Sequence, residues 1–330
     1  CTFFLTPPAK NVFCQRATMS STSASISFET KLTELADGRK ISFREYGDVE
    51  GGYPVIFMHG NLNSSKFHPS WEKTEKQTTE AGAHVFALDR PGVGETSFSW
   101  DKRTYLSWAA DVKEFAEIHD LSSFAVAGYS SGGPHAMACA LGNVPNVSAL
   151  GLVSSDGPYR AIEAEKGGDE GIIKGLYKVD SDSLAEDGSL SREKSLSRCQ
   201  DGVKHMKDSY SKISREHRRE IAIEDINWAT SQGVDGPASD SVLETSEWGF
   251  QVEDITVPTF LWHGKADTDV PVFVADFLLS KLPNLQKKTI VDTENHTMVR
   301  RSWTDILTSL IEVGKASGTK RKGTKRKSQL

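Results

Sequence analysis

The sequence has few cysteines and no long apolar run. Its four cysteines, Cys1, Cys14, Cys139 and Cys199, lie far apart, whereas a disulfide framework or a zinc site places cysteines at short, regular spacings. No stretch approaches the ~18 consecutive apolar residues that span a bilayer. We therefore expect neither a disulfide-rich secreted protein nor an integral membrane protein. Free thiols in a reducing compartment are expected instead, with Cys139 buried.

Acidic residues outnumber basic ones outside the C-terminus. The net charge of the 330 residues is −6, but the last sixteen residues hold seven Lys or Arg and no acidic residue, which leaves −13 for the rest. An acidic body argues against a nucleic-acid-binding protein. We expect no nucleic-acid partner and no stable membrane insertion, and the sequence does not indicate an oligomeric state.

The two ends have the composition of appendages. Residues 1–27 contain no acidic residue, two basic ones and many Ser or Thr, which resembles a transit peptide, and we expect them to be disordered. Residues 315–330 are expected to form a basic, disordered tail, whose lysines and arginines resemble a nuclear localisation cluster. The final Ser328-Gln329-Leu330 resembles the peroxisomal Ser-Lys-Leu signal without its basic residue. The expected location is cytoplasmic, with an organelle, the nucleus and the peroxisome as alternatives.

Between these ends, short apolar runs alternate with amphipathic stretches. This is the pattern of βα units around a mostly parallel sheet. Several runs are apolar throughout, as expected of strands buried on both faces, and apolar residues recur at helical spacing after Asp101 and in Val272–Leu282 and Trp303–Val313. The predicted fold class is therefore α/β, a mostly parallel central sheet flanked by helices. Its predicted strands are Lys40–Tyr46, Val55–Met58, His84–Leu88, Phe124–Ala127, Ala149–Val153, Thr259–Trp262 and Lys288–Val291.

The segment Pro158–Gln251 breaks this rhythm. It is rich in Glu, Lys, Asp, Ser and Gly, has few apolar runs, and includes helical stretches such as Glu216–Trp228. We predict a helical insertion, residues 158–251, between two parts of one core domain, residues 28–157 and 252–314. Because long insertions usually carry function, a lid over an active site is the expected role. A partly disordered surface loop is the alternative.

The clearest motif is Gly128-Tyr129-Ser130-Ser131-Gly132, which follows an apolar strand and precedes a run of small and apolar residues. A G-x-S-x-G pattern between strand and helix places its Ser on a strained turn, where the glycines avoid Cβ collisions with neighbouring backbone. Pro134 suits the first turn of the helix, whose N-terminus favours developing negative charge. The motif predicts that Ser130 is a nucleophile.

A Ser hydroxyl needs a base and an acid that orients the base. In folds with this motif the partners follow in the order Ser, Asp or Glu, His. Asp267 and His296 come in that order, each just after a predicted strand, where open α/β sheets place their sites. We predict Asp267 as the acid and His296 as the base. Asp269 and Asp156 are alternative acids, although Asp269 is expected instead to shape the turn that follows it.

An oxyanion hole needs two backbone N–H groups aimed at the developing negative oxygen. The predicted donors are Ser131, directly after the nucleophile, and Asn61, in the loop His59-Gly60-Asn61 after an early strand. The ring of His59 is expected to hold that loop by hydrogen bonds. This chemistry requires no metal and no cofactor, and none is expected.

Several ordered motifs resemble the alpha/beta hydrolase fold-1 superfamily, in particular its uncharacterised alpha/beta fold hydrolase members, from Val55 to about Met298. They are the elbow with Ser130-Ser131-Gly132-Gly133-Pro134, Asp89-Arg90-Pro91-Gly92-Val93-Gly94, Trp248-Gly249-Phe250 before Ile255-Thr256-Val257-Pro258, and Trp262-His263-Gly264. The resemblance covers both core parts, skips the insertion, and implies an α/β-hydrolase fold with serine-esterase-like activity and no metal. Asn295 stands where relatives usually have Gly, but Asn tolerates left-handed backbone, so the loop is expected to be kept.

The predicted function is a carboxylesterase-like serine hydrolase that acts on a small-molecule acyl substrate through an acyl-enzyme intermediate. Nucleotide binding is disfavoured, because Ser97 stands where G-x-G-x-x-G needs its third glycine. Epoxide hydrolases and haloalkane dehalogenases of the resembling fold have Asp at the elbow, so Ser130 excludes their alkyl-enzyme mechanism. Proline iminopeptidases have a motif similar to Gly-Gly-Ser-Trp-Gly at the elbow, whereas Tyr129 and Ser131 occupy the positions on either side of Ser130 in this sequence. A peptidase is therefore an alternative and not the first expectation. A ligand-binding receptor on a hydrolase fold is the other alternative.

Overall fold

An eight-stranded sheet forms the centre of the computed structural model, which describes residues 29–167 and 171–327. The strand order is β1-β2-β4-β3-β5-β6-β7-β8. Strand β2 pairs antiparallel with both of its neighbours, β1 and β4, and the remaining neighbours pair parallel. The strands are β1 (Lys31–Glu34), β2 (Lys40–Gly47), β3 (Tyr53–Met58), β4 (Ala83–Leu88), β5 (Phe124–Tyr129), β6 (Val147–Val153), β7 (Thr259–Gly264) and β8 (Leu285–Val291). The predicted α/β class with a mostly parallel sheet is confirmed.

All seven predicted strands are present, and an eighth precedes them. β1 was not predicted because three of its four residues are exposed, so it leaves no apolar run in the sequence. By contrast, all six residues of β5 are buried, as a central parallel strand requires. The predicted N-terminal extension, residues 1–27, lies outside the described residues.

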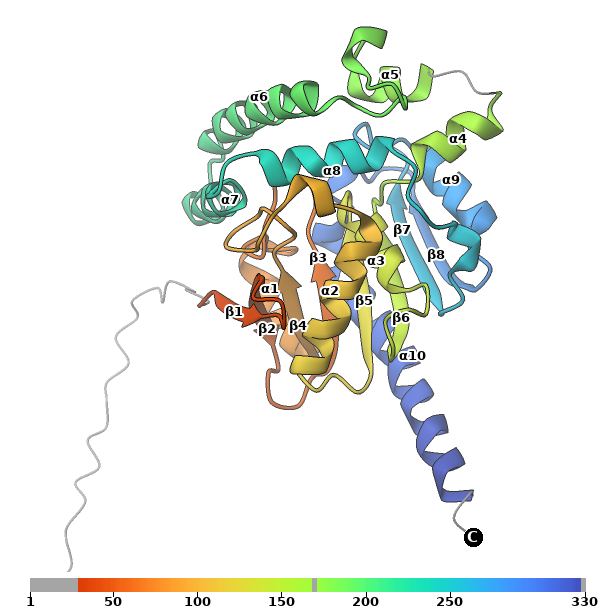
Figure 1. Ribbon diagram of the computed structural model, residues 1–330. Coiled ribbons are helices and arrows are strands. Elements are labelled where there is room, and N and C mark those ends of the chain that lie inside the picture. The colour runs from red at the N-terminus through yellow and green to blue at the C-terminus, as the bar shows by residue number, and fades with distance from the viewer. Residues whose placement is uncertain (1–28, 168–170, 328–330) are drawn as a thin grey trace, which may run out of the picture.

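Helices cover both faces of the sheet (Figure 1). One face carries α2 (Tyr105–Ile118), α3 (Gly132–Cys139) and α9 (Val272–Lys281), and the other carries α1 (Thr74–Glu80) and α10 (Val299–Lys327). Trp108 and Met137 are buried on the first face, and Trp303 and Leu310 on the second. Each face thus has its own apolar core, and the sheet separates the two. None of the described helices combines the length and the apolar character that crossing a membrane requires.

Helix α10 extends through the segment that the sequence analysis assigned to a disordered tail. It runs without interruption to Lys327. The prediction of a disordered tail from Lys315 onward was therefore wrong for the backbone of residues 315–327. Lys and Arg are good helix formers, and a helix already nucleated by packing adds further residues at little cost.

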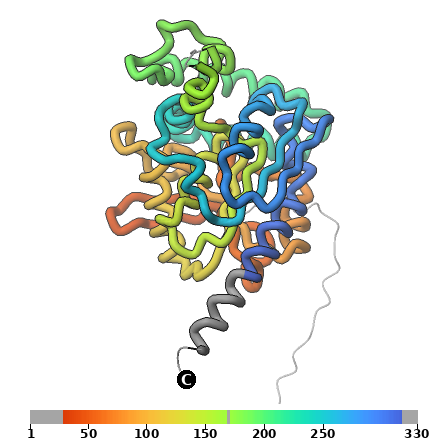
Figure 2. The backbone as a smooth tube through the Cα atoms, turned by 90° about the vertical axis from the view of Figure 1, so that its right-hand side faces the viewer, coloured from red at the N-terminus to blue at the C-terminus, as the bar shows by residue number. Residues whose placement is uncertain are grey.

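The segment between β6 and β7 is helical. Within the described residues it contains α4 (Tyr159–Glu165), α5 (Gly171–Tyr177), α6 (Arg192–Ser211), α7 (Glu216–Ala229) and α8 (Asp235–Thr245). Figures 1 and 2 show these helices gathered over one end of the sheet. That end holds the carboxyl ends of the parallel strands, because α8 contacts residues that follow β3 and β4.

Candidate active site

The nucleophile elbow lies between β5 and α3. Ser130 has a left-handed backbone with φ of +54°, which is strained for a residue with a Cβ. The flanking glycines make the turn possible: a Cβ on Gly128 would lie 2.3 Å from the carbonyl oxygen of Gly132, and one on Gly132 would lie 2.2 Å from that of Met58. Ser130 is held in place by its N–H, which donates to the carbonyl of Val153 at 3.0 Å. The strained turn predicted from G-x-S-x-G is therefore present.

Ser130, His296 and Asp267 form one hydrogen-bonded chain. Nε2 of His296 lies 2.9 Å from Oγ of Ser130, and Nδ1 of His296 lies 2.9 Å from Oδ2 of Asp267. His296 begins a short 3₁₀ turn in the segment that follows β8, and Asp267 lies in the turn that follows β7. With Nδ1 donating to the carboxylate, Nε2 is left free to accept the proton of the Ser130 hydroxyl. The structure thus brings the three residues together in the geometry that nucleophilic catalysis needs.

The carboxylate of Asp267 also fixes the turn that carries it. Its second oxygen, Oδ1, accepts the N–H groups of Asp269 at 3.0 Å and Val270 at 2.9 Å. Asp269 was expected to shape this turn, but Asp267 does so instead. The side chain of Asp269 is exposed and makes no hydrogen bond within the described part of the chain, because the buried Asp267 already accepts the backbone donors.

His296 carries a raised pKa. Burial opposes protonation and alone would lower the pKa, but the hydrogen bond and the charge of Asp267 outweigh it, and the charges of Asp269 and Asp156 raise it further. Asp267, Asp269 and His296 are also the one group among the described residues whose ligand atoms lie within 4.8 Å of one another in the manner of a metal site. Two of the three are already hydrogen-bonded to each other, so this cluster is accounted for without an ion.

Asp156, the other alternative acid, has a different partner. Its carboxylate accepts the hydroxyl of Tyr159, and its backbone N–H donates to the carbonyl of Ser130 at 3.2 Å. Burial raises the pKa of Asp156 to about 6, against the lowering effect of the Tyr159 hydrogen bond. Asp156 therefore supports the elbow through its backbone, whereas Asp267 is the carboxylate bonded to His296.

The two predicted oxyanion donors lie beside the elbow. Neither the N–H of Asn61 nor that of Ser131 donates to another group within residues 29–167 and 171–327, so both can bind an oxygen of a ligand. The loop of Asn61 lies against Ser130, since a Cβ on Gly60 would lie 3.2 Å from Cβ of Ser130. As expected, His59 holds this loop: Nδ1–H donates to the carbonyl of Gly60 at 2.9 Å, and Nε2 accepts the N–H of Arg90 at 3.2 Å. Burial and the charge of Arg90 keep the pKa of His59 well below its ordinary value, so the ring is neutral.

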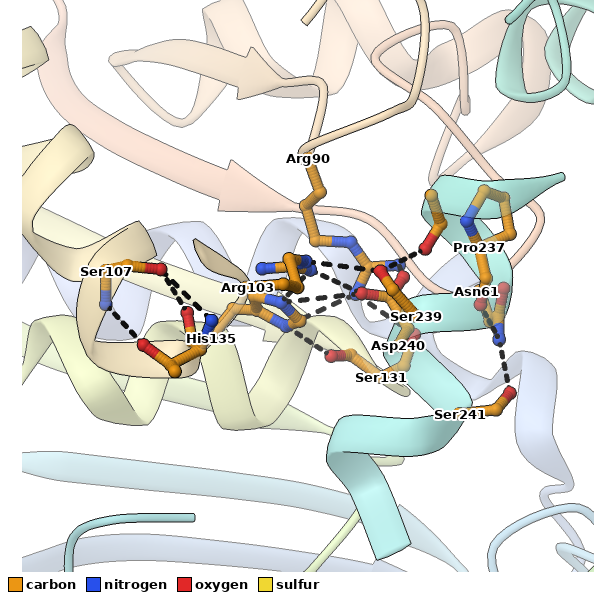
Figure 3. A network of polar contacts seen from close by, with 12 residues as sticks. Asn61, Arg90, Arg103, Ser107, Ser131, His135, Pro237, Ser239, Asp240 and Ser241 are labelled. Atoms are coloured by element: carbon orange, nitrogen blue, oxygen red, sulfur yellow. Dashed lines mark hydrogen bonds and ion pairs between the residues drawn. The ribbon is translucent and has the colours of Figure 1, made fainter. Parts of the chain in front are cut away.

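A buried polar network next to the elbow was not found by the sequence analysis (Figure 3). It joins Arg90, Arg103, His135 and Ser131 of the core to Asp240 of α8. Arg90 belongs to a motif already noted, the stretch Asp89 to Gly94, but nothing in the sequence distinguishes Asp240 from the many other acidic residues of the insertion. A buried acidic residue in a polar, mostly exposed segment has no periodic signature.

Comparisons with known proteins match the sequence to a family model and to curated relatives. The family model described as alpha/beta hydrolase fold matches residues 53–299. AB hydrolase superfamily protein YisY of Bacillus subtilis (strain 168) is 26% identical over 226 residues, which cover 68% of this chain and 78% of that protein. Ethanol acetyltransferase 1 of Cyberlindnera fabianii is 27% identical over 115 residues, but these cover only 34% of this chain and 32% of that protein.

Solved structures share the fold. The structure of the esterase EaEST from Exiguobacterium antarcticum superimposes with a TM-score of 0.65 at 20% identity, covering 86% of this chain and all of that one. The family match spans most of the chain and includes the elbow, the Asn61 loop, Asp267 and His296. The chain therefore belongs to the alpha/beta hydrolase fold family.

Proposed function

We propose that the protein is a serine hydrolase that cleaves carboxylic esters of small molecules. The observation that carries the proposal is the hydrogen-bonded chain from Ser130 through His296 to Asp267. His296 removes the proton of Ser130 as Oγ attacks the ester carbonyl, and the N–H groups of Asn61 and Ser131 bind the oxyanion of the tetrahedral intermediate. As the intermediate collapses, His296 donates the proton to the departing alcohol, and an acyl-enzyme remains on Ser130.

Hydrolysis of the acyl-enzyme repeats these steps with water. His296 removes a proton from the water, the hydroxide attacks the acyl carbonyl, and the proton returns to Oγ of Ser130 as the acid leaves. The raised pKa of His296 supports this double role, because a base whose pKa lies near the working pH both accepts and releases a proton. The helices α4–α8 are proposed to cover the site as a lid, since α8 contacts the side chain of Asn61 through Pro237 O and Ser241 Oγ, each at 3.2 Å.

Transfer of the acyl group to an alcohol is the second candidate. The observation that favours it is the partial match to an ethanol acetyltransferase. The acyl-enzyme is the same in both reactions, and an alcohol takes the place of water as the second nucleophile. Hydrolysis is distinguished from transfer by the products formed from one activated ester with and without added ethanol.

The first test is covalent labelling. A fluorophosphonate probe should modify the chain at Ser130, as located by peptide mass spectrometry, and the variant Ser130→Ala should show no labelling. Ser123→Ala is the matched control, because Ser123 lies just before the opposite end of the same strand and only bonds the hydroxyl of Tyr53. Labelling at any other residue contradicts the proposal. A burst with p-nitrophenyl acetate followed by stalled turnover would favour the receptor alternative, and faster turnover of an aminoacyl anilide than of esters would favour the peptidase.

A further inference from the structure

The buried guanidinium of Arg90 contacts both segments that carry the proposed oxyanion donors. Its Nη2 donates to the carbonyl of Gly60 at 3.1 Å, and its Nη1 donates to Oγ of Ser131 at 3.0 Å. Arg90 is completely buried. One side chain therefore links the loop after β3 to the turn after β5.

The contact with Gly60 determines where the N–H of Asn61 points. The carbonyl of Gly60 and the N–H of Asn61 belong to the same peptide group, which is planar and trans, so the two bonds point in opposite directions. Two donors hold the carbonyl from one side, Nη2 of Arg90 and Nδ1 of His59. The N–H of Asn61 is thereby aimed away from them. Hydrogen bonds to the carbonyl also polarise the peptide group and make its N–H a stronger donor.

Asp240 fixes Arg90 from the insertion. Its Oδ2 lies 2.9 Å from Nη2 of Arg90, and its Oδ1 lies 2.5 Å from Nη2 of Arg103 (Figure 3). All three side chains are buried. A buried guanidinium without a counter-charge is costly, so the position of Arg90 depends on its ion pair with this carboxylate.

The same network reaches the nucleophile turn by a second route. Nη2 of Arg103 donates to Nε2 of His135 at 2.8 Å, and Nδ1–H of His135 donates to the carbonyl of Ser131 at 2.9 Å. Burial and the charges of Arg90 and Arg103 keep the pKa of His135 well below its ordinary value, so its ring is neutral and can make both contacts. The carboxylate of Asp240 thus lies between the two guanidinium groups of Arg90 and Arg103.

We propose that helix α8 of the insertion completes the oxyanion hole, with Asp240 as a positioning residue. Asp240 holds Arg90 where Arg90 orients the Gly60–Asn61 peptide and the turn of Ser131. The inference rests on the proposed function, because it gives the insertion a part in the same site. Catalysis would then depend on the docking of α8 against the core. Movement of the α4–α8 insertion away from the core would leave the triad intact but misalign the oxyanion donors.

The kinetic test compares Asp240→Asn with Asp235→Asn. Asp235 is the matched control, since it lies on the same helix and binds Trp100 and Arg192 away from the elbow. In Asp240→Asn we expect kcat for p-nitrophenyl acetate to fall 10- to 100-fold with KM changed less than threefold. The affinity for a trifluoromethyl ketone, whose adduct with Ser130 carries an oxyanion, should fall by the same factor, because an oxyanion hole acts on the transition state. A rise in KM with unchanged kcat would mean that α8 only binds substrate, and would overturn the proposal.

A second measurement is independent of turnover. The ¹H–¹⁵N resonance of Asn61 should shift in Asp240→Asn and stay in place in Asp235→Asn. Arg90→Lys is the second variant if Asp240→Asn does not fold. It keeps the buried positive charge but replaces the planar guanidinium by a single ammonium group. It should shift the same Asn61 resonance. An unshifted Asn61 resonance in a folded variant overturns the proposal, as does a shift with unchanged kcat. Absence of Ser130 labelling in the wild type would overturn the proposed ester hydrolysis instead, and the Asn61 resonance would still decide the coupling to α8.

Discussion

Asp267 bonds to His296 with one carboxylate oxygen and to its own turn with the other. Oδ2 lies 2.9 Å from Nδ1 of His296, while Oδ1 accepts two backbone N–H groups of the following residues. The side chain of Asp267 is wholly buried. Burial and hydrogen bonds therefore fix the orientation of the Asp267 carboxylate toward His296 before any substrate binds. This is the preorganisation that the acid of a catalytic triad needs.

The first prediction concerns this acid. Asp267→Asn should lower kcat by roughly 10⁴, the loss known for the equivalent change in a serine protease, because an amide leaves the base in the wrong tautomer. Asp269→Asn is the matched control and should keep most of its rate and its stability, because its side chain is exposed. The measurement is turnover of one activated ester, with folding checked by thermal melting.

The reverse result would exchange the two roles. If Asp269→Asn were the folded but inactive variant and Asp267→Asn kept its rate, the assignment of the acid would be wrong. Thermal melting separates a loss of folding in Asp267→Asn from a loss of catalysis, which matters because the same carboxylate also holds the turn at Val270.

The second prediction is a pH profile. The free base form of His296 is the active one, and its pKa is raised, so kcat/KM should increase with pH through a midpoint above the ordinary value of about 6.5. Below that midpoint His296 is protonated and cannot accept the proton of Ser130. Asp269→Asn removes one of the charges that raise this pKa, so its midpoint should move to lower pH.

The control for the pH profile is Asp292→Asn. Asp292 lies near His296 in sequence but pairs with Lys265 at 2.8 Å, and it is not among the charges that raise the pKa of His296. Its midpoint should equal that of the wild type. An unchanged midpoint in Asp269→Asn, or an equal shift in both variants, would show that the charge of Asp269 does not reach the base.

The third prediction concerns the elbow glycine. Gly132→Ala should destabilise the fold by at least ~1–3 kcal/mol and abolish activity, because its Cβ would lie 2.2 Å from the carbonyl oxygen of Met58, which is backbone and cannot rotate away. Gly175→Ala is the control: it lies in α5, has an ordinary φ, and its Cβ would meet nothing within 4 Å. That substitution should be neutral or slightly stabilising. Urea unfolding of both variants measures the difference, and equal stability would contradict the steric argument.

The core was predictable from the sequence because burial on both faces leaves a continuous apolar run. β5 is the clearest case, with six buried residues directly before the elbow. The order of Ser130, Asp267 and His296 after such strands was enough to predict that the three would meet, because the carboxyl ends of parallel strands share one edge. β1 escaped prediction because a short edge strand with one buried residue has no such run.

The contribution of the insertion was not predictable for a different reason. Asp240 lies in a segment whose many acidic residues are mostly exposed, and its burial is decided by Arg90 and Arg103, which are more than a hundred residues away in the chain. Partners so distant in sequence produce no local spacing. The turn after β7 was wrongly predicted for another reason: Asp267 and Asp269 have identical side chains, and only the direction that the turn gives them makes Asp267 the acceptor of the backbone N–H groups.

The last prediction is that the basic end of α10 plays no part in catalysis or in folding of the core. The contacts that anchor α10 come early in the helix: Trp303, Leu307 and Leu310 are buried, and Nε1 of Trp303 donates to Oγ1 of Thr78 at 2.9 Å. Deletion of residues 316–330 leaves all of them in place. We expect kcat within about twofold of the wild type and an unchanged melting temperature.

A contrasting variant in the same helix makes this prediction decisive. Leu310→Ala removes a fully buried side chain and should cost about 2–5 kcal/mol of unfolding free energy, while the folded fraction keeps its kcat, because Leu310 lies in the core and not at the site. The deletion should leave both the free energy of unfolding and kcat unchanged. A tenfold fall in kcat on deletion, equivalent to ~1.4 kcal/mol of activation free energy, would show that the basic end reaches the active site.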